Sequence, residues 1–196
     1  MYRQQLTREQ ALQKAKHYCA YQERCHSEVK EKLYGFGLRK MDVEQLLTQL
    51  IDEDYLNEER FAVQFAGGKF RMKQWGRVKI KYELKQKGVS EYCIKKALKE
   101  IDDQAYQKTL RKLFDEKMKT LRSETNQFTR KRKLQDYLLQ KGYEAAFIQQ
   151  LFSNDDWFVL CRNEAIFIAA VLYQRKYCIK SPEAFPQWID DFNRER

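Results

Sequence analysis

The chain of 196 residues has a mass of 23.8 kDa, and 43% of its residues are apolar, which is enough to bury one large core or several small ones and excludes a purely disordered protein. Its two prolines, Pro182 and Pro186, lie in the last fifteen residues, so no proline interrupts a helix upstream and an all-α fold is predicted. The net charge of +10 and the pI near 9.3 favour an anionic partner, most commonly a nucleic acid, over an enzyme acting on acidic substrates.

The sequence indicates neither a secreted protein nor a membrane protein. The five cysteines are scattered without a CxxC pair, which suggests neither a disulfide framework nor a ribbon-type zinc site. They are Cys19, Cys25, Cys93, Cys161 and Cys178. The longest uncharged apolar run, Ala165 to Tyr173, has nine residues, whereas a membrane helix needs roughly 20. Because the start also lacks the apolar region of a signal peptide, we expect a cytoplasmic protein.

Three long amphipathic segments are predicted to be the first helices of three successive units. They are Thr7–Gln22, Asn57–Met72 and Asp103–Lys119. Thr7 and Gln10 have the spacing of a capping box at the start of the first segment. Asn57 is the expected N-cap of the second, and Glu58 and Glu59 place favourable negative charge in its first turn.

Two shorter helices, separated by a glycine, are predicted to follow in each unit. Gly37, Gly88 and Gly142 are 51 and 54 residues apart, and the apolar positions around them coincide when they are aligned. Fifteen apolar residues share this register: Val29, Leu33, Val43, Leu46, Leu47, Ile80, Leu84, Ile94, Ala97, Leu98, Leu134, Leu138, Ile148, Leu151 and Phe152. The pair before each glycine is the buried stripe of a middle helix, which the glycine ends in the αL conformation, and the set after it is the buried stripe of a third helix. Asp42 and Ser90 are the expected N-caps of the third helix in the first two units.

The sequence therefore predicts an elongated array of three tandem three-helix repeats with a C-terminal helical extension. The predicted boundaries are 1–55, 56–102, 103–155 and 156–196. Within the extension, Glu164–Tyr177 has the pattern of one more helix, which Pro182 separates from the end of the chain. A cap over the last repeat is favoured for this extension over a docking surface, because an end repeat must cover its outer face.

Positive charge is concentrated in the middle of the chain. Residues 1–68 and 154–196 each have a net charge of −1, whereas residues 69–99 have +9 and residues 108–141 have +7. The run from 69 to 81 interleaves basic and aromatic side chains, a combination that holds phosphates and stacks nucleobases. The predicted nucleic-acid or filament-binding residues are Lys69, Arg71, Lys73, Trp75, Arg77, Lys79, Lys81, Lys85, Lys87, Arg130, Lys131, Arg132 and Lys133.

Parts of this set have a second interpretation. Arg77, Lys81 and Lys85 recur every four residues and are predicted to form a basic stripe along the middle helix of the second unit. Trp75 and Phe70 are either stacking platforms for bases or anchors of the core. The cluster from 130 to 133 is either part of the interface or an ordinary solvated helix face.

The second unit carries the most distinctive motifs. They are Leu56-Asn57-Glu58-Glu59-Arg60-Phe61-Ala62, Gln74-Trp75-Gly76 and Lys87-Gly88-Val89. Together with the three three-helix units, they resemble the RecX family, regulatory proteins of the RecA recombinase. The resemblance spans roughly residues 7–153 and is strongest from 52 to 102. The extra glycine Gly35 and the last forty residues depart from the family pattern.

The resemblance implies an elongated molecule that lies in the helical groove of the RecA filament on single-stranded DNA. There it would modulate, and in the usual case inhibit, ATP hydrolysis and strand exchange, within DNA recombination, repair and the SOS response. Double-stranded DNA is a further expected ligand.

General or sequence-specific DNA binding by a basic helical protein is the alternative function, because three-helix units are also similar to helix-turn-helix domains. No dimerisation element is evident, so a monomer is expected. An enzyme is not expected, because the chain has no Walker A, GxSxG or Rossmann motif, and Gly67-Gly68 alone indicates no phosphate loop. His17 and Cys19 diverge on a helix, so no metal or other cofactor is predicted.

Overall fold

The computed structural model describes residues 6–153, and within that range the chain forms helices and loops without a strand. The helices are α1 (Arg8–Tyr21), α2 (His26–Gly35), α3 (Lys40–Asp52), α4 (Glu58–Lys73), α5 (Arg77–Gln86), α6 (Glu91–Lys99), α7 (Asp103–Thr120), α8 (Gln127–Lys141) and α9 (Ala145–Ser153). The predicted all-α repeat fold is confirmed over this range. Among these helices, none has the length and apolar character that crossing a bilayer requires.

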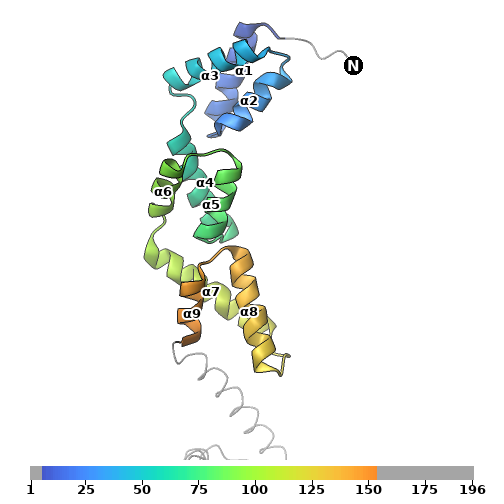
Figure 1. The fold of residues 1–196 in the computed structure, drawn as a ribbon, viewed down its shortest axis with the longest axis vertical. Coiled ribbons are helices and arrows are strands. Elements are labelled where there is room, and N and C mark those ends of the chain that lie inside the picture. The colour runs from blue at the N-terminus through green and yellow to red at the C-terminus, as the bar shows by residue number, and fades with distance from the viewer. Residues whose placement is uncertain (1–5, 154–196) are drawn as a thin grey trace, which may run out of the picture. The chain divides into compact units, whose positions relative to one another are not determined.

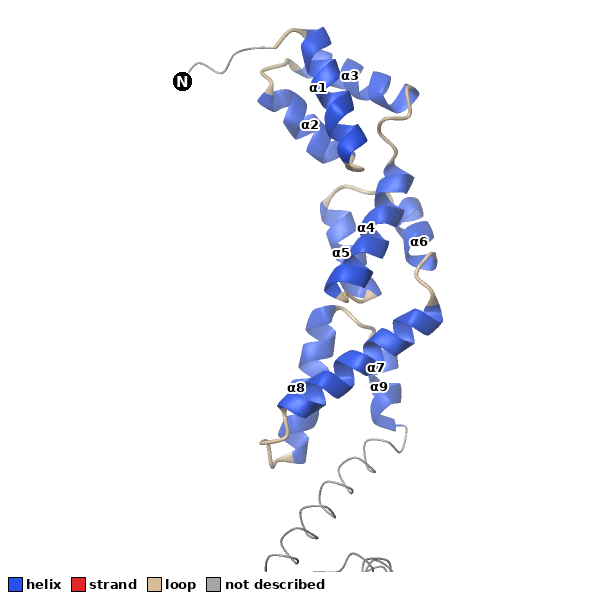
Figure 2. Ribbon diagram, turned by 180° about the vertical axis from the view of Figure 1, so that it is seen from behind, coloured by secondary structure: helices blue, strands red, loops and turns tan. Residues whose placement is uncertain are grey.

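The helices are grouped in triplets of one long and two shorter helices: α1–α3, α4–α6 and α7–α9 (Figures 1 and 2). Each triplet falls inside one of the ranges 1–55, 56–102 and 103–155, whose status as separate units stays a prediction. Residues 6–148 belong to one compact unit. The expected helix Glu164–Tyr177 and the expected extension 156–196 lie outside the described residues.

The predicted N-cap residues are observed in the structure, with one exception. Thr7 and Gln10 form a reciprocal capping box on α1, Asn57 accepts a hydrogen bond from the Arg60 backbone at 3.0 Å, and Ser90 caps α6. Asp42 is not the N-cap of α3. The helix starts at Lys40, three residues earlier than a cap at Asp42 would place it, because Arg39 already has the extended backbone of a cap residue. Asp42 therefore lies in the first turn, where its charge favours the helix dipole.

The three aligned glycines end the middle helices as predicted. Gly37, Gly88 and Gly142 have φ values of 84°, 77° and 88°, in the left-handed region that a glycine adopts without strain. Of the fifteen apolar residues in the repeat register, all except Leu98 and Leu151 are buried. The 3.6-residue period therefore predicts the core side of each short helix correctly.

Candidate nucleic-acid interface

The start of α5 packs directly on the end of α8, and we call this contact the second joint. The Gly76 N–H donates to the Lys141 carbonyl at 2.9 Å, and the Val78 N–H donates to the Gly142 carbonyl at 3.0 Å. A Cβ atom added to Gly76 would lie 2.1 Å from the Gly142 carbonyl oxygen. The two backbones approach so closely that position 76 has no room for a side chain, and the joint fixes where the segment from Trp75 to Lys79 lies.

Arg77 faces the protein at this joint. Its guanidinium donates to the Ile101 carbonyl at 2.9 Å and to the Asp103 carboxylate at 2.5 Å, and it stacks over the Tyr106 ring at 4.5 Å. The Tyr106 hydroxyl accepts from the Arg77 N–H at 3.1 Å and donates to Glu144 at 2.5 Å. Arg77 thus holds the second triplet to the third instead of extending into solvent as the stripe requires.

The other two members of the predicted stripe share one carboxylate. Lys81 lies 3.5 Å from Glu91, and Lys85 forms a closer ion pair with the same side chain. The hydrogen bond from Lys85, followed by the charge of Lys81, holds the pKa of Glu91 below its usual value. Because each stripe residue has an intramolecular carboxylate partner, the stripe presents less free positive charge than its sequence suggests.

The cluster from 130 to 133 is divided between the interior and the surface. Arg130 is buried and donates to the Glu124 carbonyl at 2.8 Å, and Lys133 pairs with the Glu124 carboxylate at 2.5 Å. The side chains of Lys131 and Arg132 are exposed. Phe128, which precedes this cluster, is 77% exposed.

Five side chains of the second triplet alternate between a cation and an aromatic ring, and we call them the lysine–aromatic row. In order they are Lys79, Trp75, Lys69, Phe65 and Lys87. The successive distances from Nζ to ring centroid are 4.8, 5.2, 5.1 and 5.7 Å. A cation at such a distance from a ring centroid makes an attractive contact with the ring and keeps its charge.

The structure separates the two aromatic residues that the sequence left ambiguous. Phe70 is buried and packs against Tyr106 with ring centroids 5.8 Å apart, so it is a core anchor. Trp75 is only partly buried and lies between the ammonium groups of Lys69 and Lys79. A partly exposed indole beside cations is the combination found on surfaces that bind single strands.

Several of the predicted cations have no acidic partner among residues 6–153. Lys69, Arg71 and Lys73 make no ion pair with any described residue, and Lys79 donates only to the Gln140 carbonyl, at 3.4 Å. Lys87 is the exception within the row, because it pairs with Glu28 at 2.6 Å. This hydrogen bond raises the pKa of Lys87, so its charge persists at neutral pH.

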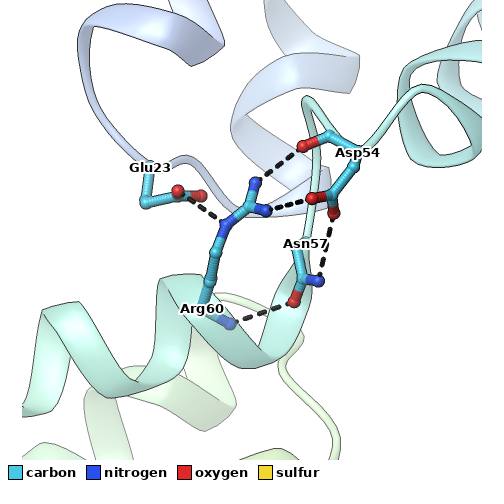
Figure 3. Close-up of polar contacts among 4 residues, drawn as sticks. All are labelled: Glu23, Asp54, Asn57 and Arg60. Carbon is cyan, nitrogen blue, oxygen red and sulfur yellow. Dashed lines mark hydrogen bonds and ion pairs between the residues drawn. The ribbon is translucent and has the colours of Figure 1, made fainter.

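The row ends at the contact between the first two triplets, which we call the first joint. There the Arg60 guanidinium donates to Glu23 at 2.8 Å, to the Asp54 carboxylate at 2.7 Å and to the Asp54 carbonyl at 2.8 Å, while Asn57 caps the helix that carries it (Figure 3). Ser27 donates to the Lys87 carbonyl at 3.0 Å. Side chains, many of them charged, therefore make this joint.

Phe65 is the one member of the row absent from the predicted set. It stands four residues before Lys69 on α4, so projecting the basic segment backwards along the helix face would have found it. No group of three His, Cys, Asp or Glu side chains close enough to hold a metal ion occurs in the described part of the chain. The arrangement offers stacking surfaces and phosphate-binding cations rather than a catalytic constellation.

Comparison with known proteins relates this arrangement to one family. The family model described as "RecX, second three-helix domain" matches residues 57–98. The regulatory protein RecX of Prosthecochloris aestuarii is 31% identical over 142 residues, covering 71% of this chain and 89% of the relative. That of Pelodictyon phaeoclathratiforme is 34% identical over 128 residues, covering 64% and 78%. The crystal structure of RecX from Lactobacillus salivarius superposes with a TM-score of 0.68 at 23% identity over 76% of this chain and 96% of that one.

Proposed function

The chain belongs to the RecX family of regulatory proteins, and from this we propose that it binds the filament that a RecA-type recombinase forms on single-stranded DNA and inhibits ATP hydrolysis and strand exchange. In this proposal the protein is a cytoplasmic monomer without catalytic activity of its own. Phosphate contacts supply attraction to the filament, and contacts with the recombinase supply selectivity.

The lysine–aromatic row is the observation that supports DNA contact. Lys69 and Lys79 carry charge that no described carboxylate neutralises, and Trp75 lies between them with its ring partly exposed. A phosphate gains more from an unpaired cation than from one already held in an ion pair, because no existing bond has to break. We therefore assign DNA contact to Lys69, Trp75 and Lys79 ahead of Arg77, Lys81 and Lys85.

Two matched double variants test this assignment. Replacing Lys69 and Lys79 with Gln should weaken binding to a single-stranded oligonucleotide, and the plot of log affinity against log salt should become shallower by about 1.4, or 0.7 for each phosphate that is no longer neutralised. Fluorescence anisotropy over a salt series measures both quantities. The same variant should need a higher concentration to suppress DNA-dependent ATP hydrolysis by a cognate recombinase.

Lys81→Gln with Lys85→Gln is the control, since it removes the same charge from residues that pair with Glu91. Its salt slope should stay close to that of the wild type. Equal losses of affinity in the two double variants would mean that only net charge matters. A wild-type protein that leaves recombinase ATP hydrolysis unchanged, or that selects one duplex sequence from a random pool, would contradict the proposed function.

A further inference from the structure

A groove with a volume of about 380 Å³ lies between the first and second triplets. One face of α4 forms its floor, with residues that recur at helical spacing: Phe61, Gln64, Phe65, Gly68, Lys69, Met72 and Lys73. The loop from Gln22 to Arg24, together with Glu28 and Lys87, forms the opposite side. The groove thus shares Lys69, Phe65 and Lys87 with the lysine–aromatic row, and its volume is in the range of sites that hold small organic ligands.

Gly68 leaves the middle of this floor open. A Cβ atom added there would meet nothing within 4 Å, so no neighbouring group requires a glycine at this position. Gly67 differs, because its Cβ would lie 2.9 Å from the Arg71 guanidinium. A glycine inside a helix costs about 1 kcal/mol relative to alanine. What the glycine at 68 provides is free space, in which a flat group can lie against the backbone of α4.

The uncompensated charge facing the groove is positive. Its acidic side chains are already engaged, Glu23 with Arg60 at 2.8 Å and Glu28 with Lys87 at 2.6 Å. Lys69 and Lys73 stand one helical turn apart at the groove and pair with no described carboxylate. The groove therefore suits a ligand that joins an anionic group to a flat, largely apolar one, which is the chemistry of a nucleotide.

We propose that this groove binds one nucleotide of single-stranded DNA, with the base against Phe65 and Gly68 and the phosphate between Lys69 and Lys73. The proposal rests on the proposed function and names the nucleotide subsite within it. A duplex keeps its bases stacked and paired, so only a single strand offers a base to the groove without the cost of unpairing. The ring centroids of Phe65 and Trp75 are no more than about 10 Å apart, because both lie close to the Lys69 ammonium group, which leaves Trp75 for a neighbouring base.

Gly68→Leu tests the subsite by filling the floor of the groove. Wild-type protein should bind an oligothymidylate at least about tenfold more tightly than an abasic oligonucleotide of the same length, since stacking one base contributes roughly 1–3 kcal/mol. Gly68→Leu should lower that preference about tenfold, which is the share of the base in the groove and not of a base on Trp75, and still bind the abasic strand as the wild type does. Gly68→Ala controls for folding, because alanine favours the helix and meets no neighbour. The melting temperature of each variant is measured by circular dichroism.

Two results would overturn the subsite. The first is wild-type protein that binds both strands equally. The second is a Gly68→Leu variant that folds normally and retains the full preference of the wild type for bases. If that variant also no longer inhibits the recombinase, the groove binds a segment of that protein instead of a base. Inhibition of the recombinase by wild-type protein that does not discriminate between the strands would remove the subsite and leave the proposed function standing.

Discussion

The Tyr106 hydroxyl joins the start of α5, two residues after Trp75, to the third triplet. Tyr106 is 1% exposed, and its hydroxyl accepts from the Arg77 N–H and donates to Glu144. Burial, and then the bond to Glu144, raises the pKa of Tyr106 well above its ordinary value, so the hydroxyl keeps the proton that it donates. The Tyr106 hydroxyl therefore forms a hydrogen bond with a backbone N–H at the start of α5, in the second triplet, and another with the Glu144 carboxylate, in the third.

Tyr106→Phe should lower the free energy of unfolding by about 1–3 kcal/mol, because it leaves a backbone N–H and a carboxylate without their partner while keeping the buried ring. Urea denaturation followed by circular dichroism measures the change. Tyr82→Phe is the matched control, because the Tyr82 side chain is 61% exposed, whereas that of Tyr106 is buried at the second joint. A Tyr106→Phe variant as stable as Tyr82→Phe would show that water replaces the missing hydrogen bonds.

Single residues also show where sequence reasoning reached its limit at the site. Lys69, Trp75 and Lys79 were predicted from the interleaving of cations and aromatic rings, a local pattern. Whether a cation is free to meet a phosphate depends on acidic partners that are distant in the sequence. Arg77 finds its partner 26 residues further on, at Asp103, and Lys87 finds its own 59 residues earlier, at Glu28. The helical period of the sequence does not encode such pairs. The sequence alone therefore cannot distinguish the paired cations of the stripe from the unpaired Lys69 and Lys79.

At the scale of elements, the second joint is a contact between two backbones. Gly76→Ala would place a methyl group 2.1 Å from the Gly142 carbonyl oxygen, and the atom it meets cannot rotate away as a side chain does. We expect a loss of stability on the order of 3 kcal/mol and a fall in melting temperature on the order of 10 °C. Thermal unfolding followed by circular dichroism measures both.

Gly35→Ala is the control for this substitution. Gly35 is the last residue of α2, and a Cβ atom there would meet nothing within 4 Å, so the variant should be unchanged or slightly more stable. Should Gly76→Ala melt at the temperature of Gly35→Ala, the two backbones would have to lie farther apart than they do in this structure. The extra glycine of the first unit thus has no packing role, whereas Gly76 does.

The helices themselves were predictable because their determinants are local. Apolar spacing, cap residues and the three αL glycines indicate where each helix lies and which side it buries. The exception, Asp42, has the residue type of a cap, but the chain turns earlier, at Arg39, whose side chain makes no capping bond. The packing of α5 on α8 joins residues more than 60 positions apart, and only the folded chain reveals why Gly76 is a glycine.

At the scale of the whole molecule, the two joints of the described triplets differ in kind. The second joint combines hydrogen bonds between two backbones with the Arg77–Asp103 ion pair, whereas each contact given above for the first involves a side chain, in ion pairs or a serine hydroxyl. Ion pairs that are partly exposed to solvent weaken as salt rises, whereas buried backbone hydrogen bonds respond little. Lys87 belongs both to the first joint and to the lysine–aromatic row, so a phosphate that reaches the row competes with Glu28 for it.

Glu28→Gln should therefore strengthen binding to single-stranded DNA, because it frees Lys87 to take a phosphate in place of the carboxylate. We expect a gain of a few-fold at low salt and a salt slope steeper by about 0.7, the contribution of one further phosphate contact. Anisotropy titrations of a labelled oligonucleotide over a salt series give both values. Glu23→Gln removes the same charge from the same groove but leaves Lys87 paired with Glu28, so its salt slope should not steepen. If the two variants gain equally, the effect comes from net charge alone, and the first joint does not compete with DNA for Lys87.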